Sequence, residues 1–95
     1  MASIGFHESE DKLSAATRDM HRAIVSLMED LEAVDWDNQR CDACADPELR
    51  GILEHNRDEE KEHAAMLLEW IRRGDQKISG ELKRYLFSDK AIAGH

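Results

Sequence analysis

A regular spacing of apolar residues through positions 47–73 constrains this chain more than any other feature. Residues recur at alternating steps of four and three, the repeat of a helix that packs one face against another helix. The positions on this stripe are Leu49, Leu53, Asn56, Glu60, His63, Leu67 and Trp70. A second stripe, within positions 11–40, comprises Met20, Ala23, Leu27, Asp30 and Val34, widened by Ile24, Met28 and Leu31. The two stripes predict two long amphipathic helices.

Local signals place the ends of these helices. Asp46 is suited to cap the second helix and Pro47 to occupy its first turn. Gly74 and Asp75 then end that helix. The connection at 41–46 is short, so we expect the two helices to be antiparallel neighbours.

A third, shorter amphipathic helix is predicted at 79–87, where the apolar residues are Leu82, Tyr85, Leu86 and Phe87. Residues 1–10 show no sustained period and are predicted to form a flexible arm. The predicted organisation is therefore an arm at 1–10, one helical domain at 11–88 and a short tail at 89–95.

Composition also favours an all-α chain. Of the 95 residues, 36% are charged, 5% are aromatic and one is proline, which suits helices better than a sandwich or barrel. The net charge of −8 makes nucleic acid and anionic membranes poor partners and cations good ones. No apolar run approaches the roughly 20 residues of a membrane span. With no signal-peptide pattern and two cysteines, the chain is expected to be cytoplasmic.

A hairpin of two helices cannot bury both apolar stripes by itself. Pairing two hairpins into a four-helix arrangement would cover the stripes. We therefore expect a homodimer.

Three ionisable residues interrupt the apolar stripes: Asp30 on the first and Glu60 and His63 on the second. Four-helix di-iron proteins take a Glu from each of two helices and a Glu-x-x-His pair from each of the other two. Two copies of this chain would supply four carboxylates and two imidazoles, enough to neutralise two divalent cations. Carboxylate and imidazole ligands suit iron, manganese or zinc, and oxygen-rich ligation favours iron. The alternative is a non-catalytic metal-binding or scaffold protein in which Glu60 and His63 fix dimer register.

Four runs of sequence resemble the encapsulated ferritins: MHRAIVSLMEDLEAVDW at 20–36, DPEL at 46–49, HNRDEEKEHAAM at 55–66 and LEW at 68–70. The resemblance implies a half-length ferritin-like protein that dimerises to build a ferroxidase centre with two iron ions. It further implies a ring of five dimers that is cargo of an encapsulin nanocompartment. The implied activity is oxidation of Fe(II) to Fe(III) by dioxygen, delivering iron for storage in the shell.

The resemblance also implies which residues bind iron. The family's ligands fall at Asp30, Glu60 and His63, where Asp30 replaces a glutamate and is one methylene shorter. Asp37 stands where the family carries a tyrosine beside the site. A rubrerythrin-type oxidase is disfavoured, because the chain lacks the two Cys-x-x-Cys pairs that a rubredoxin iron needs.

A second acidic group, Glu29 and Glu32 with Trp36, lies on one face of the first predicted helix, separate from the core stripe. The resemblance implies that these glutamates attract incoming metal at the mouth of the dimer, near the tryptophan. The alternative is an ordinary solvated acidic face.

The remaining candidates have ordinary interpretations. Cys41 and Cys44 have the spacing of a redox or zinc pair, but no second pair exists, so free thiols in a loop are expected. His21 and His55 are expected to be surface or packing histidines.

Overall fold

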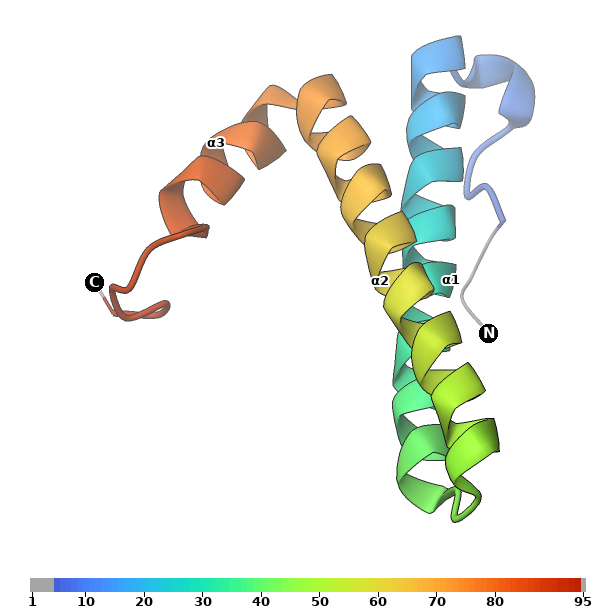
Figure 1. The fold of residues 1–95 in the computed structure, drawn as a ribbon. Coiled ribbons are helices and arrows are strands. Elements are labelled where there is room, and N and C mark those ends of the chain that lie inside the picture. The colour runs from blue at the N-terminus through green and yellow to red at the C-terminus, as the bar shows by residue number, and fades with distance from the viewer. Residues whose placement is uncertain (1–4, 95) are drawn as a thin grey trace.

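The computed structural model describes residues 5–94, and this part of the chain is all-α (Figure 1). A short 3-10 helix, η1 (Glu10–Lys12), precedes three α-helices, α1 (Ala15–Ala43), α2 (Pro47–Gly74) and α3 (Gln76–Tyr85). Helices α1 and α2 form an antiparallel hairpin, and α3 projects away from the open end of that hairpin (Figure 1). The predicted all-α class and the order of two long helices and a short one are confirmed.

Side-chain caps explain where the long helices begin. Ser14 accepts a hydrogen bond from the Thr17 backbone N–H at 3.1 Å, so α1 starts a few residues later than predicted. Asp46 accepts one from the Leu49 backbone N–H at 2.8 Å, and Pro47 occupies the first turn of α2, as predicted.

The predicted bounds of the third helix, 79–87, are wrong. Asp75 accepts a hydrogen bond from the Ile78 backbone N–H at 2.9 Å and so caps α3, which therefore begins at Gln76. The helix ends at Tyr85, and Phe87 has a positive φ of 57°, which is incompatible with a continuing helix.

Cys41 lies in α1 and not in a loop as expected. The helix continues to Ala43, which buries Cys41 against α2 and leaves Cys44 as the C-terminal capping residue. Both cysteines are free thiols, as predicted.

Small side chains form most of the seam between α1 and α2. Its buried apolar residues are Ala23, Cys41, Ala64 and Ile71. Ala64 and Ile71 follow His63 and Trp70 by one position, so the buried face of α2 is shifted to one side of the predicted stripe, while Leu53, Glu60 and Leu67 of that stripe stay half-buried. Leu49, Asn56 and Trp70 of that stripe are exposed for this reason.

Many large apolar side chains remain at the surface of the described chain. On α1 these include Ile24, Met28 and Leu31, and on α2 Leu49, Ile52, Met66 and Trp70. Contiguous exposed apolar residues on a protein of this size mark an interaction surface. The hairpin therefore presents apolar faces that its own seam does not use.

An ion-pair cluster holds the joint between α2 and α3. Arg72 and Arg73 both donate hydrogen bonds to the Glu69 carboxylate, which lower the pKa of Glu69 to about 2. Arg72 also donates to the Ser79 hydroxyl at 2.9 Å. One arginine thus connects the last turns of α2 to α3.

Residues 1–4 of the predicted arm lie outside the described part of the chain. Within the arm, the Phe6 ring lies 4.6 Å from the His21 ring of α1, measured between centroids. The division into arm, domain and tail stays a prediction. None of the helices in residues 5–94 is long and apolar enough to cross a bilayer.

Candidate metal centre

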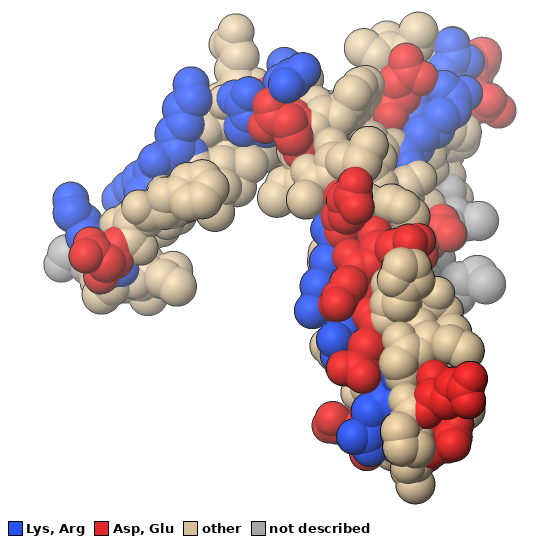
Figure 2. Space-filling view, in the orientation of Figure 1, with Lys and Arg blue, Asp and Glu red and all other residues tan. Residues whose placement is uncertain are grey.

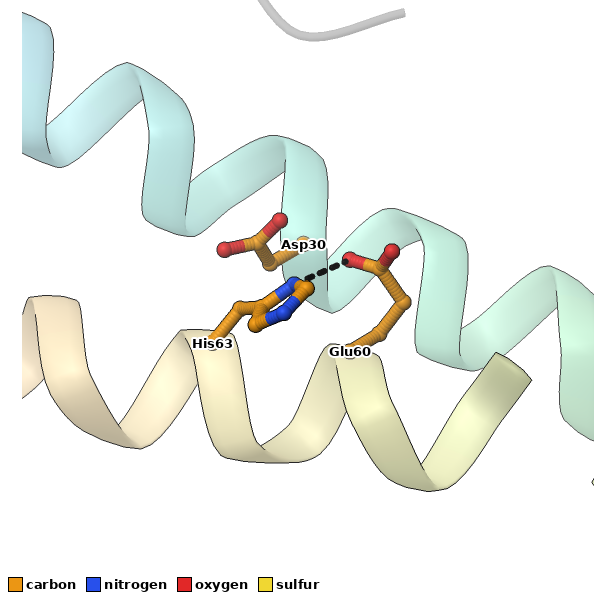
Figure 3. A group of neighbouring side chains, drawn as sticks. All are labelled: Asp30, Glu60 and His63. Carbon is orange, nitrogen blue, oxygen red and sulfur yellow. Dashed lines mark ion pairs between the residues drawn. The ribbon is translucent and has the colours of Figure 1, made fainter. Parts of the chain in front are cut away.

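The structure brings Asp30, Glu60 and His63 together in the middle of the hairpin. Asp30 comes from α1, and Glu60 and His63 from successive turns of α2, so their side chains converge between the two helices (Figure 3). One potential ligand atom from each residue lies within 4.8 Å of the other two. Two carboxylates and an imidazole at this separation are suited to holding one divalent cation of the iron, manganese or zinc type.

Local helix geometry explains this arrangement. Residues three apart on a helix lie on the same side, so Glu60 and His63 point in similar directions. The Nδ1 of His63 lies 3.8 Å from a carboxylate oxygen of Glu60 (Figure 3). The antiparallel pairing of α1 and α2 then places Asp30 opposite that turn.

The three residues differ in how far they are buried. Asp30 and Glu60 are half-buried in the seam, whereas the side chain of His63 is 53% exposed. The group therefore opens toward the surface on the side of His63. A ligand set that is open on one side leaves room for further ligands.

Electrostatics within the group favour a bound cation. A hydrogen bond with Asp30, burial and the negative charge of Asp30 raise the pKa of Glu60, and His63 opposes this shift. Without a cation, two carboxyl groups this close are more easily accommodated when they share a proton. A bound divalent cation also removes the repulsion between the two carboxylates, and it carries twice the charge of a proton.

The predicted metal-attraction residues lie nearby on α1 but outside this group. Glu29 is exposed, Glu32 is half-buried and Trp36 is 45% exposed. The Arg40 guanidinium lies over the Trp36 ring, 5.9 Å from its centroid. Figure 2 shows acidic side chains gathered along the middle of the hairpin. The role that the resemblance implies for these residues stays a prediction.

His21 and His55 lie outside the metal-ligating group. His55 forms an ion pair with Glu59 at 2.8 Å, and its side chain is 71% exposed. His21 packs against Phe6.

Sequence reasoning missed the burial of Asp37. This residue is 8% exposed and pairs with Arg40 at 2.9 Å. Its position, seven residues after Asp30, repeats the helical stripe and was the available signal for an inward-facing carboxylate.

Comparison with known proteins places the sequence in a family. The sequence model of the EncFtn-like family matches residues 5–89. The chain is 60% identical over 86 residues to the encapsulated ferritin-like protein of Rhodospirillum rubrum; the match covers 90% of this chain and 61% of that protein. It is 52% identical over 87 residues to the ferritin-like protein of Thermotoga maritima, covering 92% of this chain and 76% of that one.

A solved structure agrees with the fold. The crystal structure of protein ne0167 from Nitrosomonas europaea is 66% identical in sequence and superimposes with a TM-score of 0.91. The match covers 95% of this chain and 99% of that one. With the family match and the identities above, these agreements show that the chain belongs to the EncFtn-like family of ferritin-like proteins.

Proposed function

We propose that this protein is a ferroxidase, which oxidises Fe(II) to Fe(III) with dioxygen at a centre built from Asp30, Glu60 and His63. The observation that carries the proposal is the convergence of these three side chains within 4.8 Å on a hairpin of ferritin-like family. Carboxylates lower the energy of the more highly charged Fe(III) product, and imidazole completes a ligand set suited to both oxidation states. Fe(II) is the substrate and dioxygen takes its electrons.

The centre is proposed to be shared by two chains. Leu49, His63 and Trp70 are separated by multiples of seven residues and so lie along one exposed face of α2. A second hairpin packed on this face would cover the two large apolar side chains. The same contact would close the open side of the metal group.

Charge balance supports a pair of iron ions at such an interface. Two copies of Asp30 and Glu60 carry four negative charges when ionised, equal to the charge of two Fe(II) ions. Each chain alone offers two carboxylates and one imidazole, which leaves coordination positions open. Burying an unbalanced charge in an interface is costly, so cations and dimer are expected to stabilise each other.

Glu29 and Glu32 are proposed to attract incoming Fe(II), close to Trp36. Glu29 is exposed next to Asp30, and acidic side chains gather along the middle of the hairpin, which supports that role (Figure 2). Exchanging Glu32 for Ala is expected to slow oxidation at low Fe(II) and to leave the number of ions bound at saturation unchanged.

From family membership we propose that five dimers assemble into a ring. We also propose that an encapsulin shell encloses this ring in the cytoplasm and holds the oxidised iron. The name of the Rhodospirillum rubrum relative describes that protein as encapsulated. Light scattering after size exclusion, with and without Fe(II), tests the assembly. Identical masses with and without iron at low protein concentration would contradict a site shared between chains.

Anaerobic loading with Fe(II), followed by exposure to dioxygen, tests the ferroxidase assignment. Glu60→Ala and His63→Ala should each lose most of the oxidation rate, because each removes a ligand. The matched control is His55→Ala, which removes an exposed histidine of the same helix that pairs with Glu59. Oxidation at the parent rate in both ligand variants would show that the centre lies elsewhere.

The second candidate function is that of a non-catalytic helical dimer. Such a dimer either binds metal without oxidising it, or uses Glu60 and His63 only to fix the register of its helices. The ion pair between Glu60 and His63 at 3.8 Å favours it, since such a pair can set register without a metal. Stoichiometric Fe(II) binding without accelerated oxidation would support the metal-binding form. Dimerisation with no iron bound would support the register form.

A further inference from the structure

Asp37 stands out as a buried charged residue in the described chain. It is 8% exposed, and its carboxylate pairs with the Arg40 guanidinium, Nη1 to Oδ1, at 2.9 Å. The Arg40 side chain is itself 55% exposed. Water screens a charge on an exposed side chain far more than one in the seam, so Arg40 only partly cancels the negative charge of Asp37.

The position of Asp37 relates it to the metal centre. It lies on α1 seven residues after Asp30, which is about two turns and roughly 10 Å along the helix axis. Both residues face the seam with α2. A buried charge at this separation acts on the ligand group through the weakly screening seam, although Asp37 is not one of the three clustered residues.

We propose that Asp37 is a positioning residue of the metal centre, whose buried charge strengthens the attraction of Asp30, Glu60 and His63 for a divalent cation. Arg40 sets how much of that charge the cation experiences. The role is electrostatic and requires no bond between Asp37 and the metal. It rests on the proposed function in one respect, namely that this group binds a cation.

Opposite substitutions in the pair test the proposal. Metal-free, assembled protein is titrated with Zn²⁺ by calorimetry at fixed pH and ionic strength, which avoids any dependence on oxidation. Asp37→Asn should weaken binding roughly tenfold, the order expected for loss of one partly shielded charge at this distance. Arg40→Gln should tighten binding several-fold. The double variant should fall between the two single variants, because the fields of the two charges add.

Thermal unfolding of the same variants separates this role from a structural one. Breaking the half-buried ion pair between Asp37 and Arg40 from either side removes a hydrogen bond between charged groups and is expected to lower the melting temperature. Stability should therefore fall in both single variants while Zn²⁺ affinity moves in opposite directions. The control is Asp42→Asn, which removes the same charge from an exposed position of α1 and should change the Kd by less than about twofold.

Each outcome decides a different claim. If the parent binds Zn²⁺ and Asp37→Asn binds it equally well, the role of Asp37 is wrong and the metal centre stands. Weaker binding by both single variants would show a purely structural role and would also overturn the proposal. If Asp37→Asn does not fold, the Zn²⁺ affinity of Arg40→Gln tests the proposal. Unchanged or weaker binding by Arg40→Gln would contradict the proposed role of Asp37. A parent that binds no Zn²⁺ would overturn the metal centre and this role together.

Discussion

One carboxylate oxygen of Asp30 and one of Glu60 lie within 4.8 Å of each other across the seam between α1 and α2, and hydrogen bonding with Asp30 is the main cause that raises the pKa of Glu60. Like-charged carboxylates repel when both are ionised, so this contact is favourable only when a proton or a cation lies between them. The metal-free hairpin therefore carries an electrostatic cost in its seam at neutral pH. That cost is what a bound cation would relieve.

The first prediction concerns the pH dependence of that cost. The pKa of Glu60 is raised above its ordinary 4.5, so the folded state binds this proton more tightly than the unfolded state. The resulting stabilisation is fully present below about pH 4.5 and is lost as the pH rises through the folded pKa. With chelator present, Glu60→Gln should therefore melt at a higher temperature than the parent at pH 7, with the difference shrinking in acid.

Thermal unfolding between pH 4 and pH 8 checks this, with Glu59→Gln as the control on an exposed position of the same helix. A lower melting temperature for Glu60→Gln at pH 7 would show that the raised pKa does not reflect repulsion. Saturating Zn²⁺ should reverse the order, because the parent then gains a ligand that the amide lacks.

The second prediction concerns Glu69, whose pKa is lowered to about 2 by hydrogen bonds from Arg72 and Arg73. A depressed carboxylate pKa contributes stability above its unfolded value of 4.5, and that stability is lost as the pH falls through about 2. Glu69→Gln should lower the melting temperature at pH 7 and make no difference below pH 2. Because Arg72 also donates to Ser79, hydrogen exchange in α3 should rise in this variant.

Glu62→Gln is the matched control, since Glu62 is an exposed carboxylate on the same helix. An equal effect of the two substitutions would mean that the arginine cluster adds nothing specific to the α2–α3 joint.

The third prediction compares two glycines of α2. A Cβ at Gly51 would meet nothing within 4 Å, whereas one at Gly74 would lie 3.3 Å from the Met20 Cε. Gly51→Ala should increase the free energy of unfolding by about 0.5–1 kcal/mol, because alanine is the better helix former. Gly74→Ala should gain less, since Met20 must move by a few tenths of an ångström. Urea denaturation of both variants measures the difference, and an equal gain would contradict the close approach to Met20.

Local chemistry explains what the sequence predicted well. The Asp46 cap and Pro47 fix the start of α2 through contacts within one turn, so no tertiary information was needed. Asp30, Glu60 and His63 could be named from the sequence because ionisable residues interrupt the apolar stripes; the structure brings them together, and their binding of metal stays a prediction. The same reasoning missed the cap at Asp75, which was read as ending α2 but also starts α3.

Periodicity could not reveal which face of α2 meets α1. A helix that is apolar on two sides satisfies the same repeat in either orientation. In the structure Ala64 and Ile71 are buried, so the face that carries them is the one that meets α1. His63 consequently lies at the open edge of the seam. The burial of Asp37 escaped notice for a related reason, because a lone aspartate is normally exposed.

The last prediction tests residue 30, where this chain carries the shorter carboxylate. Asp30 is half-buried, and one of its carboxylate oxygens lies within 4.8 Å of ligand atoms of Glu60 and His63, so it reaches the group without the extra methylene. Asp30→Asn should lose most of the Zn²⁺ and Fe(II) affinity, since the amide is neutral and a poorer ligand. Asp30→Glu should keep the charge and therefore the binding, while overpacking of the seam lowers the free energy of unfolding by about 1–3 kcal/mol.

Calorimetry measures metal affinity, which should fall in Asp30→Asn. Urea denaturation measures the free energy of unfolding, which should fall in Asp30→Glu. The control is Asp35→Asn, an exposed position of α1 whose carboxylate accepts a hydrogen bond from Gln39. It should leave affinity for either metal unchanged. Unaltered stoichiometry and Kd in Asp30→Asn would remove residue 30 from the site. The cation would then depend on Glu60 and His63, with any further ligands supplied by a second chain.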